Sequence, residues 1–178
     1  MASYLVFGSA ESRREMSSET LVLPNVYGLI RNSAGGVLIQ RRWKPRSDPD
    51  TLGMWELPGG KWRAGESAQD CLRRELQEEC GLDISAVDGS FATHNHLDQQ
   101  VETSTPLLMV QMLAGPYTSA LAIYSGFSDG QPAAQGDGAR DAHFMSPADL
   151  KHALIADAAA FTALSFAALT ELAARDLL

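Results

Sequence analysis

The sequence predicts one domain of the α/β class, followed by a helical segment at the C-terminus. Short apolar runs bounded by glycine, proline and asparagine recur between residues 22 and 124, which is typical of strands. Apolar residues with helical spacing at residues 67–80 lie between the earlier and the later of these runs. An alanine-rich helical pattern follows residue 146. A chain of 178 residues is long enough to bury the core of one such domain.

Residues 1–21 are expected to form an N-terminal extension. They are rich in serine, apart from the apolar run at residues 4–7, which fits a short edge strand or an oligomer contact. No apolar run in the first twenty residues is long enough for a signal peptide or a membrane span. We therefore expect a cytoplasmic protein with no membrane partner.

A β-hairpin is predicted next. The apolar runs Val26–Ile30 and Val37–Gln40 are its strands, and Asn32–Gly36 has the composition of a turn. A basic, proline-containing loop, Arg41–Asp50, follows it. The next expected strand is Trp55–Leu57, which ends at Pro58-Gly59-Gly60.

One helix is expected between Ser67 and Cys80. Ser67 is a suitable N-cap, and Gly81 is the residue type that usually ends a helix in the left-handed conformation. Later strands are expected at residues 84–87, 91–94, 106–113 and 121–124. Residues 125–141 are predicted to be a long loop because glycines are spread among polar residues.

Two helices are expected near the C-terminus, one opening at Ser146-Pro147 and one at Asp157. The domain is expected to span residues 22–153. Residues 154–178 would then form a C-terminal helix that packs on the domain or lies at a homodimer interface.

Charge narrows the range of partners. Fourteen basic residues against 22 acidic residues give a net charge of −8, which repels a phosphate backbone unless basic groups are locally concentrated. We therefore expect no long nucleic acid as partner. The two cysteines, Cys71 and Cys80, would lie about 13 Å apart along one helix, too far for a disulfide within the chain.

A spaced motif of the form G-x5-E-x7-R-E-L-x-E-E-x-G-L carries the chemistry. Its fixed positions are Gly60, Glu66, Arg74, Glu75, Leu76, Glu78, Glu79, Gly81 and Leu82. This motif resembles the Nudix box at every fixed position. The preceding segment, Trp55–Lys61, is similar to the segment that usually precedes the box in this family. The resemblance spans residues 22–153 and implies a Nudix-type α/β/α sandwich with a mixed β-sheet.

Glu75, Glu78 and Glu79 are three and four positions apart, so a helix places them on one side. Such a cluster is repulsive at neutral pH, and a divalent cation removes the repulsion. Ligands that are all oxygens favour Mg2+ or Mn2+ over zinc. The alternative is a solvated acidic face. The helical wheel argues against it, because Glu79 falls inside the apolar stripe of residues 68, 72, 76 and 80.

The resemblance assigns further roles. It implies that Glu66 pairs with Arg74 to fix the loop against the helix, and that the Gly59 carbonyl joins Glu75, Glu78 and Glu79 at the metal. Glu78 or Glu75 is the expected general base. The place where the family often has a later acidic ligand falls near Gly138, so Asp137, Asp141 or Glu102 would have to replace it.

A basic cluster lies in the loop after the hairpin. It comprises Arg41, Arg42, Lys44 and Arg46. Arg41 and Lys61 are expected to contact substrate phosphates, with Arg42 as a further candidate. The alternative is a solubilising surface loop.

These observations predict a magnesium-dependent hydrolase that cleaves the P–O–P bond of a small nucleotide-like substrate, either a nucleoside triphosphate or another nucleoside diphosphate derivative. One alternative is a Nudix-like nucleotide-binding sensor, but such proteins lose box glutamates and here all are present. A second is an enzyme similar to prenyl-diphosphate isomerases. That chemistry needs a catalytic cysteine, and neither Cys71 nor Cys80 occupies a convincing position.

Overall fold

A computed structural model of the chain describes residues 20–178. The expected N-terminal extension, including the apolar run at residues 4–7, therefore lies outside the described residues except for its last two positions. Within residues 20–178, no helix is long and apolar enough to cross a membrane.

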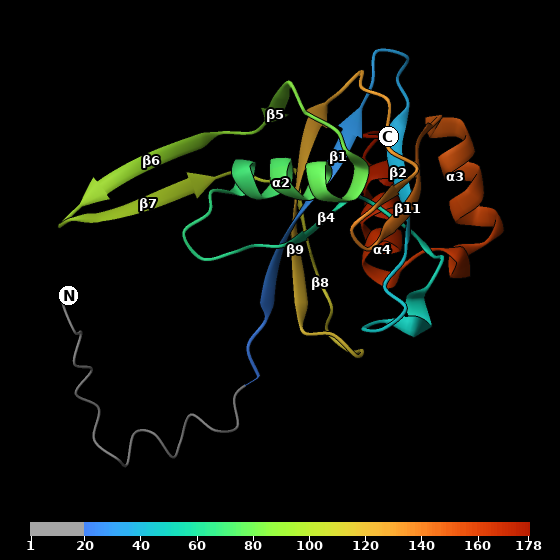
Figure 1. The fold of residues 1–178 in the computed structure, drawn as a ribbon, viewed down its shortest axis with the longest axis horizontal. Coiled ribbons are helices and arrows are strands. Elements are labelled where there is room, and N and C mark those ends of the chain that lie inside the picture. The colour runs from blue at the N-terminus through green and yellow to red at the C-terminus, as the bar shows by residue number, and fades with distance from the viewer. Residues whose placement is uncertain (1–19) are drawn as a thin grey trace.

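The centre of the fold is a mixed nine-stranded sheet (Figure 1). Its main path runs β10-β11-β2-β1-β9-β5, while β3 pairs with β2, β4 with β1 and β8 with β9. The strands are β1 (Leu23–Arg31), β2 (Val37–Arg42), β3 (Trp55–Glu56), β4 (Gly59–Lys61), β5 (Ala86–Asp88), β8 (Leu108–Gln111), β9 (Ser119–Phe127), β10 (Gln135–Gly136) and β11 (Ala139–Met145). Strands β1 and β9 are parallel, and the other pairs are antiparallel.

Helices cover both faces of this sheet. Helix α2 (Ala68–Cys80) lies on one face, whereas α3 (Pro147–Ala156) and α4 (Ala163–Ala174) lie on the other (Figure 1). Two short 3-10 turns, Pro49–Thr51 and Ala158–Ala160, complete the helical elements of residues 20–178. The prediction of an α/β/α sandwich with a mixed sheet and a helical C-terminal segment is confirmed.

Successive side chains of β1 point alternately into two apolar cores, which explains why its sequence is apolar at nearly every position. Val26 and Ile30 join the core beneath α2, while Tyr27 and Leu29 join the core beneath α3 and α4. Successive side chains of a strand point to opposite faces. A strand that is buried on both faces therefore reads as a continuous apolar run.

The predicted hairpin and the predicted helix are both present. Strands β1 and β2 are antiparallel, with Arg31 opposite Val37. The Ser67 side chain accepts a hydrogen bond from the Asp70 amide, and Gly81 ends α2 with φ 63°. The polar hairpin formed by β6 (Phe91–His96) and β7 (Gln99–Ser104) is a separate two-stranded sheet that projects from the body (Figure 1).

The expected loop at residues 125–141 is wrong in part. Strand β9 continues to Phe127, and β10 and β11 occupy residues 135–136 and 139–145. The core-facing residues of β11 are Ala139 and Ala142, which are small. A register shift between Arg140 and His143 also interrupts the alternation. The large apolar residues of β11, Phe144 and Met145, come only at its end and pack on opposite faces of the sheet. The strand therefore lacks the regular alternation that usually marks one.

The helix expected to open at Asp157 begins instead at Ala163. Between them, residues 158–160 form a single 3-10 turn, and Phe161 is extended with φ −111° and ψ 146°. Phe161 forms a bridge to Trp55 of β3 and is buried. Burial of this aromatic ring against the sheet interrupts the helical pattern that the sequence suggests.

Candidate active site

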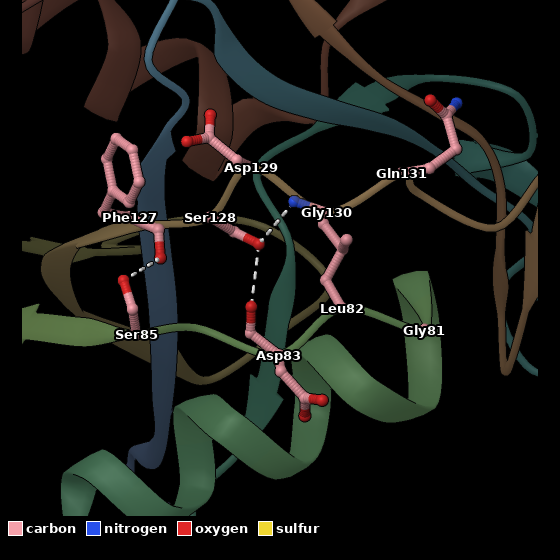
Figure 2. Close-up of a pocket in the computed structure, with 9 residues that line it drawn as sticks. All are labelled: Gly81, Leu82, Asp83, Ser85, Phe127, Ser128, Asp129, Gly130 and Gln131. Atoms are coloured by element: carbon pink, nitrogen blue, oxygen red, sulfur yellow. Dashed lines mark hydrogen bonds between the residues drawn. The ribbon is translucent and has the colours of Figure 1, made fainter.

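The structure has a cavity of about 400 Å³ beyond the C-terminal end of α2 (Figure 2). Its lining residues are Gly81, Leu82, Asp83, Ser85, Phe127, Ser128, Asp129, Gly130 and Gln131. The Ser128 hydroxyl donates to the Asp83 carbonyl (2.7 Å) and accepts from the Gly130 amide (3.3 Å). None of the site residues predicted from the sequence lines this cavity. The candidate site is instead formed by the carboxylates of α2.

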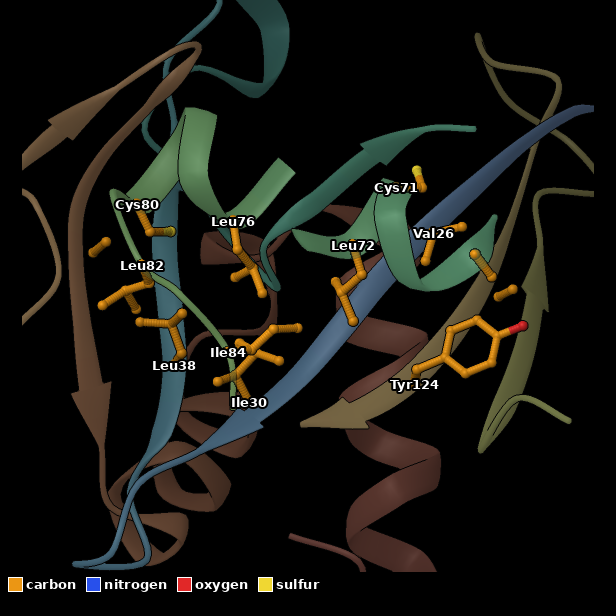
Figure 3. Close-up of a cluster of buried hydrophobic side chains, with 13 residues drawn as sticks. Val26, Ile30, Leu38, Cys71, Leu72, Leu76, Cys80, Leu82, Ile84 and Tyr124 are labelled. Carbon is orange, nitrogen blue, oxygen red and sulfur yellow. The ribbon is translucent and has the colours of Figure 1, made fainter. Parts of the chain in front are cut away.

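Apolar packing fixes α2 on the sheet. Leu72, Leu76 and Cys80 point from the helix toward Ile30 of β1 and Leu38 of β2 (Figure 3). All five side chains are fully buried. Because this face is packed tightly, the direction of every polar side chain on α2 is also defined.

Gly59 brings the loop before α2 close to the sheet. Gly59 lies opposite Tyr27 in the β1–β4 pairing and has φ 142°. A Cβ atom at this position would lie 2.4 Å from the Val26 carbonyl oxygen, so the backbone admits only glycine. The Gly59 amide donates a hydrogen bond to Oε2 of Glu79 (3.1 Å). The loop is thereby linked to the last turn of α2.

Glu79 is the most buried carboxylate of the motif, with 2% of its surface exposed. Its Oε2 atom also accepts from Nε2 of Gln40 (2.7 Å). Its Oε1 atom accepts no hydrogen bond from residues 20–178 and faces the Lys44 ammonium at 3.8 Å. Burial, followed by repulsion from Glu56, raises the pKa of Glu79 to about 8. A cation at Oε1 would therefore relieve an unfavourable buried charge.

Glu56 was not identified from the sequence, although it is as buried as Glu79. It lies opposite Gln40 in the β2–β3 pairing. The Arg42 guanidinium contacts Glu56 at 3.2 Å and Asp48 at 2.6 Å. Burial raises the pKa of Glu56, and the nearby Arg42 opposes that shift. Strand alternation next to Trp55 and Leu57 was the only signal that Glu56 faces α2.

Arg74 organises the other motif glutamates. Its Nε and Nη2 atoms pair with the two oxygens of Glu66 at 2.7 and 3.0 Å. Its Nη1 atom contacts Glu75 and also Glu78, the latter at 3.2 Å. The hydrogen bond from Arg74 lowers the pKa of Glu66 to about 2. Arg74 therefore holds the loop residue Glu66 against the helix.

The site residues offer oxygen donors of the kind that Mg2+ and Mn2+ prefer. Glu75 is buried and packs on Gly60, where a Cβ atom would lie 2.5 Å from the Glu75 carboxylate. The Glu78 side chain is 37% exposed. Within residues 20–178, no three acidic, histidine or cysteine side chains are already gathered around one point. Binding of one ion by all three glutamates therefore requires their side chains to move closer together.

The three later acidic residues considered from the sequence occupy different places. The Asp137 amide donates to the Glu78 carbonyl (2.9 Å), so Asp137 lies at the same end of α2 as Glu79. Glu102 accepts a hydrogen bond from the Ala68 amide (3.1 Å) at the opposite end, about 16 Å away along the helix. Asp141 is exposed and lies 4.0 Å from Arg41.

The basic residues also separate. Arg42 is tied to Glu56 and Asp48, on the same face of β2 as Gln40. Arg41 points to the other face, where its guanidinium lies 3.7 Å above the Trp55 ring and donates to the Gly53 carbonyl. Lys61 has an exposed side chain, and its carbonyl accepts from Arg74 (3.2 Å).

Comparison with known proteins places this site in a family. The sequence model of the NUDIX domain matches residues 22–165. The chain is 40% identical to the 8-oxo-dGTP diphosphatase of Haemophilus influenzae over 55 residues. This matched segment covers 31% of this chain and 38% of that protein. It is 39% identical over 74 residues to the RNA pyrophosphohydrolase of Edwardsiella ictaluri, 42% of this chain and 38% of that protein. These matches span only about a third of the relatives' length.

Two solved structures share the fold. The MutT protein of Methanosarcina mazei Go1 has a TM-score of 0.61 and 19% identity, covering 90% of this chain and 99% of that one. The MutT NUDIX hydrolase of Burkholderia pseudomallei has a TM-score of 0.50 and 17% identity, covering 72% of this chain and 86% of that one. At this identity the likeness concerns the fold alone.

Proposed function

The chain belongs to the Nudix family, and from that premise we propose that it hydrolyses the P–O–P bond of a nucleoside triphosphate or another nucleoside diphosphate derivative. One observation carries the proposal: Glu79 is buried, and its Oε1 atom accepts no hydrogen bond from the described residues. A divalent cation satisfies such a carboxylate. The names of the relatives, an 8-oxo-dGTP diphosphatase and an RNA pyrophosphohydrolase, support a phosphoanhydride substrate.

The proposed metal ligands are the Gly59 carbonyl and the carboxylates of Glu75, Glu78 and Glu79. Bound Mg2+ or Mn2+ would offset the charge of the phosphates and acidify a water molecule. Arg74 and Glu66 hold the loop and helix in register through their bidentate pair. Glu78, the most exposed of the three glutamates, is accessible to a water molecule and is the preferred general base, with Glu75 as the alternative.

Phosphate binding is proposed for the exposed Lys61 and for Arg41. Arg42 was a further candidate, but Asp48 and Glu56 occupy its guanidinium, so a phosphate-binding role is not proposed for it. The proposed substrate is a small nucleotide, because the net charge of −8 disfavours a long nucleic acid. We further propose that the protein acts in the cytoplasm. A homodimer through the C-terminal helix would have to use its outer face, since Ala168, Leu169 and Leu172 of α4 are buried against the sheet.

A substrate panel tests the proposed activity. Nucleoside triphosphates including 8-oxo-dGTP, ADP-ribose, dinucleoside polyphosphates, nucleotide sugars and coenzyme A would each be incubated with Mg2+, and phosphate and diphosphate release measured. We expect release from at least one substrate and its loss in excess EDTA. Undiminished turnover in EDTA would overturn the metal mechanism. Binding without turnover of every panel member would favour the nucleotide-binding sensor.

A further inference from the structure

We propose that Lys44 is a built-in counterion of Glu79, which competes with the divalent cation in the free protein and turns to the substrate phosphates when they bind. This inference rests on the proposed function, because it takes Glu79 as a metal ligand and a phosphate compound as substrate. It adds a coupling between the two binding events. Metal and substrate would each tighten the binding of the other.

The direction of the β2 side chains brings Lys44 to this position. Gln40 and Arg42 lie two residues apart on β2, and they contact Glu79 and Glu56. The backbone stays paired beyond the end of β2, since the Trp43 amide donates to the Gly138 carbonyl (2.7 Å). Lys44 therefore continues the alternation and points to the same carboxylates, with its ammonium 3.8 Å from Glu79.

Gly138 holds the stem of Lys44. It has φ 69°, and a Cβ atom there would lie 2.3 Å from Cε of Lys44. The same turn is attached to α2, because the Asp137 amide donates to the Glu78 carbonyl (2.9 Å). The lysine thus lies between the turn and the helix that carries Glu79. About a third of its side chain remains exposed, so the ammonium can reach a ligand in solution.

The two oxygens of Glu79 have different partners. Oε2 accepts from Gln40 and Gly59, whereas Oε1 faces only Lys44 among the residues described. At 3.8 Å this ion pair is longer than a hydrogen bond. When Glu79 is ionised, the attraction is therefore Coulombic and does not require a fixed geometry. A divalent cation at Oε1 would lie close to the ammonium, and the two positive charges would repel each other.

Substrate phosphates can remove this repulsion. Arg42 is not free to do so, because Asp48 and Glu56 already occupy its guanidinium. Lys44 has a flexible stem and one long ion pair, so it is the cation at this carboxylate that can exchange partners. When phosphates attract Lys44, the metal at Glu79 loses its competitor.

Manganese binding to the full-length protein tests the proposal without measuring turnover. The dissociation constant would be measured above pH 8, where Glu79 is ionised, by calorimetry or by the spin-resonance signal of free Mn2+, with and without a methylene-bridged nucleoside triphosphate analogue. For Lys44→Met we expect Mn2+ to bind the free protein about tenfold more tightly, since the competing charge is gone. The analogue should then increase the Mn2+ affinity less than it does in the wild type.

Two variants control for charge and geometry. Lys44→Arg keeps the positive charge and should bind Mn2+ as the wild type does. Arg73→Met removes one positive charge from an exposed position of α2 and should leave the Mn2+ affinity unchanged. If Lys44→Met does not fold, as judged by its thermal transition, Lys44→Gln supplies the second neutral side chain.

The outcomes separate this inference from the proposed function. An unchanged or weaker Mn2+ affinity in both neutral Lys44 variants overturns the competition, even if the wild type hydrolyses a panel substrate. Tighter Mn2+ binding in a neutral variant supports the competition, even if no panel substrate is hydrolysed, and the proposed activity alone then fails. Absence of Mn2+ binding to the wild type would overturn both.

Discussion

Glu56 and Glu79 are two buried carboxylates from different elements that approach one amide side chain, that of Gln40. Gln40 donates to Glu79 at 2.7 Å and lies opposite Glu56 in the sheet. Burial is the largest cause of the raised pKa of Glu79, and the charge of Glu56 raises this pKa further. The protein thus keeps a carboxylate where its ionised form is unfavourable without a cation, which is typical of a functional site.

The first prediction concerns stability against pH without metal. The folded protein holds a proton on Glu79 up to pH about 8, whereas the unfolded chain releases it near its ordinary pKa of about 4.3. Between these values the folded state binds more protons, so the free energy of unfolding falls as pH rises, by at most about 1.4 kcal/mol per pH unit from this group.

Chemical denaturation in EDTA between pH 5 and 9 measures this slope. Glu79→Gln cannot titrate at that position, so its free energy of unfolding should depend less on pH than that of the wild type. Addition of Mg2+ should stabilise the wild type most at high pH, where the carboxylate is ionised. Equal slopes for the variant and the wild type would show that Glu79 does not titrate in this range.

The second prediction concerns the pair of Glu66 and Arg74. Its bidentate contact is mostly buried, with side-chain exposures of 14% and 17%. We expect Glu66→Gln to lower the free energy of unfolding by about 1–3 kcal/mol and also to reduce turnover. Because the pKa of Glu66 is lowered to about 2, this stabilisation is present above the unfolded pKa and is lost as pH falls toward 2.

Glu171 provides the control for that experiment. It forms an ion pair with Arg175 of the same length, 2.7 Å, but both side chains are about half exposed. Glu171→Gln should therefore change the free energy of unfolding by less than about 0.5 kcal/mol. If the two variants are equally stable, the Glu66–Arg74 pair does not hold the loop against the helix.

The sequence predicted the position and the buried face of α2 better than the surroundings of that helix. Helical spacing placed Glu79 inside an apolar stripe, and the side chain is indeed buried. Gln40 and Glu56 were missed as neighbours of Glu79. The pairing of β2 with β3 brings them together beside it, and the register between strands is not encoded in local spacing. Strand β11 was missed for a different reason, since its buried residues are alanines.

The third prediction separates two basic residues that the sequence treated alike. Arg42→Ala would leave the buried carboxylates of Glu56 and Asp48 without their cation. We expect it to lower the free energy of unfolding by about 3–5 kcal/mol. Lys61 is exposed, so Lys61→Ala should change stability by less than about 1 kcal/mol while raising the Michaelis constant for the substrate. Unchanged Michaelis constants in Lys61→Ala would place phosphate recognition elsewhere.

The last prediction concerns Glu79 in the reaction itself. Glu79→Gln keeps the size of the side chain and an oxygen that can accept from Gln40 and Gly59, so the variant should fold. It removes the negative charge at the proposed metal. Since metal-assisted charge stabilisation contributes several kcal/mol and each ~1.4 kcal/mol is tenfold in rate, kcat should fall by about a thousandfold or more.

Parallel measurements of rate and melting temperature, with and without Mg2+, decide this prediction. The Mg2+-dependent rise in melting temperature should shrink in Glu79→Gln together with kcat, because both follow from one lost ligand. Glu171→Gln, which removes an exposed glutamate of α4, should keep the wild-type rate and the wild-type response to Mg2+. A Glu79→Gln variant with near wild-type kcat and the full Mg2+ response would exclude Glu79 as a ligand. The buried carboxylate would then serve only to fix Gly59 and Gln40 in place.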